Sequence, residues 1–160
     1  MKLASGGCPV AKLLEAGVNV ALGTDSTASN NDLDMIGEMR SAALLGKHIS
    51  ADASALNATQ TLRMATINGA RALGIAETTG SLEIGKAADL IVTDTRSVSM
   101  APVYEPVSHL VYAASRDCVE HVWVAGKQLV RERKLTTLNE DEIYRNAKHW
   151  LQKIAAAQQS

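Results

Sequence analysis

Phenylalanine is absent from this 160-residue sequence, and two tryptophans and three tyrosines are its only aromatic residues. A hydrophobic core must therefore be built from aliphatic side chains, chiefly alanine, leucine, valine and isoleucine. Such a composition is typical of parallel strands covered by helices. Cysteine is also scarce. Cys8 and Cys118 lie far apart and form no CxxC pair, which argues against a disulfide framework and favours two free thiols.

An excess of charge of either sign is lacking as well. The sequence has 16 basic and 17 acidic residues, which give a formal net charge of −1. It contains no basic patch with interleaved aromatic residues, so it predicts no nucleic-acid partner and no attraction to an anionic membrane. No run approaches the roughly 18 apolar residues of a membrane-spanning helix, and the N-terminus has no secretory pattern. We therefore expect a cytoplasmic protein without a membrane partner.

Motifs that would define a complete catalytic site are missing. The sequence contains no GxSxG nucleophile elbow, no GxxxxGK[ST] phosphate loop and no strand followed by GxGxxG. A catalytic zinc or iron site usually needs at least three protein ligands. The histidines form neither an HxH nor an HExxH pair, and each is best explained as a surface or interface residue: His48, His109, His121 and His149.

One stretch nevertheless suggests chemistry. The apolar run 18–22 has the length of a strand covered on both faces, and Gly23 and Thr24 lead from it to a single carboxylate, Asp25. Barrel and open-sheet α/β enzymes bind ligands in the loops after such strands. We therefore hypothesise that Asp25 is a catalytic metal ligand at the carboxyl end of the last strand of a barrel. The alternative is that Asp25 caps a turn or a helix, since Thr-Asp-Ser is ordinary turn chemistry.

Hydrophobic periodicity predicts helices in the first half of the chain and a change to strands near residue 80. The expected elements are helices at 10–16, 32–47, 53–73 and 139–157, and strands at 18–22, 88–94, 119–124 and 128–130. The last helix should bury one apolar stripe, because its apolar residues recur at helical spacing. Asn30 and Asn31 are candidates either for the N-cap of the second helix or for contact with a substrate.

Several motifs in a fixed order resemble the amidohydrolase superfamily. They are Gly17-Val-Asn-Val-Ala-Leu-Gly-Thr-Asp-Ser26, Ser29-Asn-Asn-Asp-Leu-Asp-Met35, Glu38-Met-Arg40, Thr66-Ile-Asn-Gly-Ala-Arg-Ala-Leu-Gly74 and Gly80-Ser-Leu-Glu-Ile-Gly-Lys-Ala-Ala-Asp-Leu-Ile-Val92. Within the superfamily, the chain resembles the branch that contains 5-methylthioadenosine/S-adenosylhomocysteine deaminase and the triazine chlorohydrolases. The resemblance covers nearly the whole chain.

The resemblance implies an α/β fold, a (β/α)₈ barrel of the TIM type with a small β-sandwich assembled from both chain ends. Residues 1–78 would form the last βα units of the barrel, residues 79–135 a segment of the sandwich and residues 136–160 a C-terminal helix. The chain is shorter than the 200 or so residues of a complete barrel. We therefore expect it to correspond to roughly the C-terminal third of such an enzyme, beginning at an internal methionine.

The resemblance also implies one divalent metal, zinc or iron, held by an HxH pair, a further histidine and an aspartate after the last strand. Asp25 matches that aspartate, both as a metal ligand and as the catalytic residue that accepts a proton from the metal-bound water. The other ligands and the glutamate that protonates the purine ring lie upstream in the family and are absent from this chain. We therefore expect the isolated chain to bind metal poorly and to have little or no activity.

The implied function is metal-dependent deamination of a purine nucleoside such as 5'-methylthioadenosine or S-adenosylhomocysteine. A triazine-type chlorohydrolase is the alternative within the superfamily, because it would use the same aspartate. A further alternative is a non-catalytic truncated fragment, or a partner subunit that folds with a separate N-terminal portion. We expect a homo-oligomer or association with the missing portion, since truncation leaves apolar surfaces and sheet edges uncovered.

Overall fold

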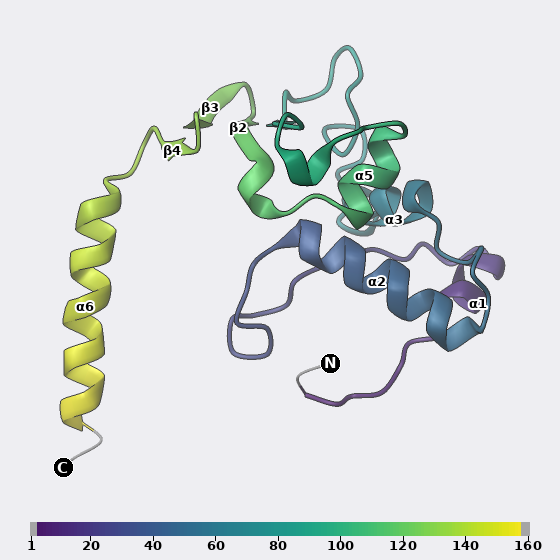
Figure 1. The fold of residues 1–160 in the computed structure, drawn as a ribbon, viewed down its shortest axis with the longest axis horizontal. Coiled ribbons are helices and arrows are strands. Elements are labelled where there is room, and N and C mark those ends of the chain that lie inside the picture. Colours follow the sequence, from purple (N-terminus) through teal and green to yellow (C-terminus); the bar gives the residue numbers. More distant parts are fainter. Residues whose placement is uncertain (1–2, 158–160) are drawn as a thin grey trace.

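The computed structural model describes residues 3–157, which form six α-helices, two short 3₁₀ helices and four β-strands (Figure 1). In chain order these are α1 (Val10–Glu15), α2 (Met35–Ser50), α3 (Ala58–Met64), α4 (Ile67–Ala72), β1 (Leu90–Thr93), a 3₁₀ helix (Val98–Met100), α5 (Pro106–Tyr112), a 3₁₀ helix (Arg116–Cys118), β2 (Val119–Val124), β3 (Lys127–Arg131), β4 (Lys134–Leu135) and α6 (Glu140–Ala157). Helices α1, α2, α3 and α5 lie together in one body, and β2, β3 and β4 lie between that body and α6 (Figure 1).

The core lies where α2, α3 and α5 meet. Helix α2 contributes Ile36, Met39 and Ala43, whose spacing of three and four residues places them on one helix face. They form a single cluster with buried residues of the segment 100–118: Met100, Val111, Ala114 and Cys118. This cluster contains no aromatic side chain, as the composition predicts, and it fixes the position of α2.

Helix α2 begins at Met35, a little after its predicted start, because Asp34 is its N-cap. The Asp34 carboxylate accepts hydrogen bonds from the amides of Ile36, at 3.0 Å, and Gly37, at 3.1 Å. These amides would otherwise lack a partner at the helix start. Asp34, rather than Asn30 or another residue of the preceding loop, therefore caps α2.

The helical region predicted over 53–73 is two helices with a break between them. Asn57 opens α3 with a capping box, in which it exchanges two hydrogen bonds of 3.0 Å with Gln60. Helix α3 ends at Met64, and α4 begins only at Ile67. Thr66 leaves the helical path between them, with φ −129° and ψ −100°. The prediction that this region is helical is confirmed, but the sequence did not predict the break.

The strand predicted over 18–22 is not present in the described part of the chain. The segment is irregular and is bonded to helices instead. The Leu22 amide donates to the Met64 carbonyl at 2.9 Å, and Asn68 Nδ2 donates to the Val20 carbonyl at 3.0 Å. A strand needs a neighbouring strand for its hydrogen-bond ladder, and each described strand belongs to the sheet β1–β4, which does not include this segment. The predicted barrel around it therefore stays a prediction.

The four strands form one antiparallel sheet in the order β1-β2-β3-β4. The strands predicted at 119–124 and 128–130 are present and form a hairpin: β2 and β3 are joined by Ala125 and Gly126, with φ 49° and 77°. Two residues of positive φ match the twist of a tight hairpin. Asp89 holds this turn, because its Oδ1 accepts a hydrogen bond from the Ala125 amide at 2.6 Å. Residues 3–157 contain no second sheet, so a sandwich is not formed by these residues alone.

Helix α5 links the two halves of the chain. It follows β1 in sequence but packs against α2 and α3, and its Val111 is fully buried in their cluster. The sequence over 106–114 suits either a short helix or an irregular turn, and the structure shows a helix over Pro106–Tyr112. Helix α5 therefore packs with helices that precede the sheet in the sequence. The division of the chain at residues 78 and 135 stays a prediction.

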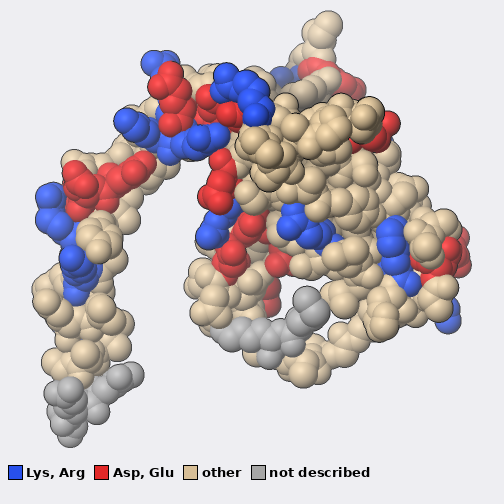
Figure 2. Space-filling model, in the orientation of Figure 1, with Lys and Arg blue, Asp and Glu red and all other residues tan. Residues whose placement is uncertain are grey.

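Helix α6 stands apart from the rest of the molecule (Figure 1). The stripe predicted to be buried is exposed instead, with Trp150 58% and Leu151 68% accessible, since no described element packs closely on it. Figure 2 shows acidic and basic side chains interspersed over the sheet and α6. None of the helices in the described residues combines the length and the apolar character needed to cross a membrane.

Candidate metal-ligand site at Asp25

Asp25 lies in the loop between the irregular segment 18–22 and the N-terminus of α2. Its backbone is left-handed, with φ 59°. Few residues other than glycine adopt this conformation, and aspartate is among those that do so more often. Its side chain is exposed. A loop, rather than the end of a regular strand, therefore positions the candidate ligand.

Two donors hold the Asp25 carboxylate in its charged form. The hydroxyl of Ser29 and then the amide of Ser26 lower the pKa of Asp25 below its ordinary value. The Ser26 amide donates to Asp25 Oδ1 at 2.7 Å. At neutral pH the carboxylate is ionised and can only accept, which is the form that binds a divalent cation. Its chemistry therefore suits a single oxygen ligand.

A compact turn carries both of these donors. The amides of Ser29 and Asn30 donate to the Ser26 carbonyl at 3.1 Å and 2.8 Å. The side chain of Asn30 continues from the turn to α2, where its Nδ2 donates to Glu38 Oε1 at 2.6 Å. From the sequence, Glu38 belongs only to a motif that resembles the amidohydrolase superfamily, and this contact with Asn30 is not predicted. The available signal was an amide in a loop followed by a carboxylate in the first turn of the next helix.

The described residues do not fit a complete metal site. They contain no group of three or more His, Cys, Asp and Glu side chains that could hold a metal ion. As predicted, His48 and His149 lie at the surface. His121 lies in β2, where its Nδ1 accepts a hydrogen bond from the Glu132 amide at 3.1 Å. Asp25 can supply one ligand, whereas a zinc centre takes three or four protein ligands.

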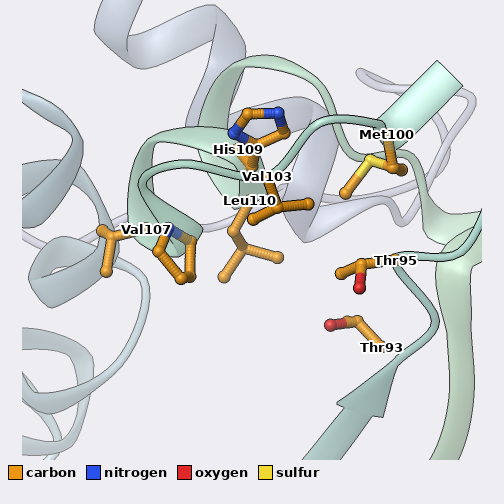
Figure 3. A pocket seen from close by; sticks show the side chains of 8 residues that line it. Thr93, Thr95, Met100, Val103, Val107, His109 and Leu110 are labelled. Atoms are coloured by element: carbon orange, nitrogen blue, oxygen red, sulfur yellow. The ribbon is translucent and has the colours of Figure 1, made fainter.

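A separate apolar pocket lies between the end of β1 and α5 (Figure 3). Its polar groups are the hydroxyls of Thr93 and Thr95 and the ring of His109, the fourth histidine. The remaining walls are apolar and come from Met100, Val103, Pro106, Val107 and Leu110. Asp25 does not line this pocket, so the pocket and the candidate ligand are distinct features of the chain.

A model of the amidohydrolase family matches residues 1–129. The 5-methylthioadenosine/S-adenosylhomocysteine deaminase of Teredinibacter turnerae is 53% identical over 156 residues, which are 98% of this chain and 35% of the relative. The 5'-deoxyadenosine deaminase of Methanosarcina mazei is 45% identical over 156 residues, which are 98% of this chain and 36% of the relative. The chain thus spans about a third of the length of the curated relatives it matches.

Solved structures share this arrangement. An adenosine deaminase from Xanthomonas campestris with bound zinc superposes with a TM-score of 0.94 at 47% identity, covering 97% of this chain and 35% of that chain. Atrazine chlorohydrolase from Arthrobacter aurescens, complexed with zinc, gives 0.80 at 32% identity and covers 88% of this chain and 31% of that chain. The predicted resemblance is therefore confirmed. Because the family model matches more than half of the sequence, the chain belongs to the amidohydrolase family.

Proposed function

We propose that this chain is the C-terminal part of a metal-dependent aminohydrolase that deaminates a purine nucleoside of the 5'-methylthioadenosine or S-adenosylhomocysteine type. The observation that carries the proposal is the match to a deaminase over nearly the whole chain, at 53% identity. The names of the relatives share an adenosine altered at its 5' position. The reaction would consume one water and release one ammonia, leaving a carbonyl oxygen where the purine carried its amino group.

We assign to Asp25 the role of one ligand of a single divalent metal, zinc or iron, and of a catalytic residue. The carboxylate is exposed and ionised, so it retains lone pairs that can be given to a cation or to a proton. The zinc in two similar structures supports a divalent metal. The other ligands would come from polypeptide outside the described residues, because these contain no group of three or more His, Cys, Asp and Glu side chains that could hold a metal ion.

Two alternatives have weaker support. A triazine-type chlorohydrolase would use the same carboxylate, but the chlorohydrolase structure is less similar than the adenosine deaminase structure, at 32% against 47% identity. A non-catalytic fragment or partner subunit is favoured only by the incomplete ligand set of the described residues. The nucleoside deaminase therefore accounts for more of the observations.

We further propose that the chain works in association, either as a homo-oligomer or with polypeptide equivalent to the rest of its relatives. Two features support this. The segment 18–22 has no strand beside it in the described chain, and the apolar stripe of α6 is uncovered. Burial of such surface is the main driving force of association. A cytoplasmic location stays a prediction from the sequence.

A chimera provides the test of the function and of Asp25. This chain replaces the matching third of the Teredinibacter turnerae deaminase, and the purified chimera is assayed for bound zinc and for ammonia release from 5'-methylthioadenosine and S-adenosylhomocysteine. Asp25→Asn should lower turnover by about 100-fold or more, as the loss of a direct proton acceptor does. It should also lower the zinc content, since the amide is a poorer ligand than the carboxylate.

Asp52→Asn is the matched control. Asp52 is also an exposed aspartate, and the side chain and amide of Ser54 lower its pKa much as Ser29 and Ser26 lower that of Asp25. This variant should keep the activity of the chimera. Full activity in Asp25→Asn, or an equal loss in both variants, would contradict the assignment. Release of chloride from a chlorotriazine without ammonia from nucleosides would favour the chlorohydrolase, and a folded chimera with neither activity would favour the non-catalytic alternative.

A further inference from the structure

Contacts at both ends of its loop hold Asp25 in place. Upstream, the Leu22 amide donates to the Met64 carbonyl at 2.9 Å, which ties the loop to the end of α3. Downstream, Asn30 Nδ2 donates to Glu38 Oε1 at 2.6 Å, which ties it to the first turn of α2. The chain between these anchors forms no helix or strand. The direction of the carboxylate therefore depends on the two anchors.

A short series of hydrogen bonds leads from Glu38 to Asp25. The bond to Glu38 fixes the Asn30 side chain, and the Asn30 amide donates to the Ser26 carbonyl at 2.8 Å. The Ser26 amide in turn donates to Asp25 Oδ1 at 2.7 Å. The Asn30 side chain is engaged at both ends, since its Oδ1 accepts a hydrogen bond from the Asp32 amide at 3.4 Å. A rotated Asn30 side chain would lose both of these contacts.

Glu38 lies on α2, a helix that is anchored in the main core. Its neighbours along α2, Ile36 and Met39, are only 6% and 4% exposed and belong to the main core. Asn30 and Glu38 are themselves partly shielded from solvent. A charged acceptor makes the bond between them stronger than one between neutral groups. Glu38 is therefore a fixed point against which the loop can be aligned.

A second contact of the same loop is more exposed. Asp32 pairs with Arg116 at 2.6 Å, but the two side chains are 46% and 64% accessible. Solvent-exposed ion pairs of this kind contribute little, because water and salt screen them. The pair therefore offers a matched variant in which a carboxylate contact of the same loop is removed, while the Asp32 backbone amide that donates to Asn30 is kept.

We propose that Glu38 is a positioning residue for Asp25, acting through Asn30 and Ser26. Partners that orient a metal ligand without touching the metal typically change metal affinity or activity by about 10–100-fold when they are lost. That Asp25 is such a ligand rests on the proposed function. The dependence of the Asp25 turn on Glu38 rests only on the hydrogen bonds described above.

An exchange of polarity between the two side chains tests the coupling. Asn30→Asp places two carboxylates against each other and breaks the bond. Glu38→Gln keeps an oxygen that can accept from Asn30. The double variant Asn30→Asp/Glu38→Gln restores the bond in the opposite direction, because the glutamine amide then donates to the new aspartate. All three changes are nearly isosteric, so the bond is altered with little change in side-chain volume.

The first readout is the backbone order parameter of Ser26, Ser29 and Asn30 by ¹⁵N NMR relaxation on the full 160-residue chain. Asn30→Asp should lower these values from about 0.85 toward 0.6 or less. Glu38→Gln and the double variant should remain near the wild-type values, as should Asp32→Asn. Unchanged order in Asn30→Asp, or a double variant as mobile as Asn30→Asp, would overturn the proposal.

The second readout is zinc affinity and turnover in the chimera described above. Asn30→Asp should weaken zinc binding by about 10-fold or more, and the double variant should recover most of it. A purely structural role would instead lower the urea midpoint of unfolding without restoring metal affinity in the double variant. If the order parameters behave as expected while Asp25→Asn leaves the chimera active, the positioning holds and the proposed function fails. The reverse pattern would refute the positioning alone.

Discussion

Gly46 of α2 lies directly against the buried side chain of Leu56. A Cβ atom built on Gly46 would come within 2.6 Å of Leu56 Cδ2 and 3.0 Å of its Cδ1, whereas carbon atoms in contact prefer about 3.5–4.0 Å. Leu56 is only 1% exposed. The missing side chain at position 46 thus lets the loop before α3 close onto α2, the helix that follows the loop of the candidate ligand.

Gly46→Ala should therefore lower the free energy of unfolding by about 1–3 kcal/mol, as overpacking of a filled core does. The better helix propensity of alanine offsets only part of this. Gly69→Ala in α4 is the matched control, because a Cβ there meets nothing within 4 Å. It should raise stability by about 0.5–1 kcal/mol. Urea denaturation followed by circular dichroism measures both, and stabilisation in both variants would show that Leu56 yields without cost.

Asp34→Ala should destabilise the start of α2. It removes the carboxylate that accepts from the amides of Ile36 and Gly37, and the loss of an N-cap of this kind costs about 0.5–2 kcal/mol. Asp34→Asn should cost much less, because the amide oxygen can still accept. Urea denaturation gives the two free energies, and hydrogen exchange at the Ile36 amide should quicken only in the alanine variant. Equal stability of both variants would show that the cap contributes nothing here.

Features with local causes could be predicted from the sequence. The helix from Val10 and the hairpin turn at Gly126 both follow from residues a few positions apart. The resemblance to the amidohydrolases also depends on short motifs, and the family match confirms it. These predictions hold because the deciding contacts are close together along the chain.

Features that need a distant partner could not be predicted in the same way. The run 18–22 has the composition of a strand, but a ladder requires a second strand that the described residues do not place beside it. The stripe of α6 has the spacing of a buried face and is nevertheless exposed. The bond from Asn30 to Glu38 depends on how the loop folds back onto α2. The role of Asp25 itself stays a prediction, because the other ligands that it implies are not among these residues.

Asp94 should make stability depend on acid pH. Its carboxylate bonds to Arg96 at 2.8 Å and lies 3.5 Å from Arg133. Hydrogen bonds from the Arg96 side chain and amide, and then the charges of both arginines, hold the pKa of Asp94 far below its ordinary value. A pKa lowered by folding stabilises the folded state above the unfolded-state value of about 3.9, and that stability is lost as the pH falls through the folded-state value.

The free energy of unfolding should therefore be higher for the wild type than for Asp94→Asn at neutral pH. This difference should shrink below about pH 4. Urea titrations at a series of pH values measure it. The difference between the wild type and Arg96→Gln should depend on pH in the same way as the difference between the wild type and Asp94→Asn, because Arg96→Gln removes the main cause of the lowered pKa of Asp94. Added salt should reduce the effect, since the Arg96 side chain is 79% exposed. A difference that is constant from neutral to acid pH would exclude Asp94 as its source.

The exposed stripe of α6 should make the chain associate. Leu151 and Ile154 are 68% and 55% accessible, and burial of each such side chain is worth about 1.5–3 kcal/mol. Leu151→Glu/Ile154→Glu should therefore weaken self-association by about tenfold or more, measured by sedimentation velocity over a range of concentrations. Arg145→Glu changes the net charge equally from the opposite helix face, so it should leave association intact. If all three proteins sediment as monomers, the stripe does not bind a second copy. Addition of the other two thirds of the Teredinibacter turnerae deaminase should then shift the sedimentation of the wild-type chain but not that of the double variant.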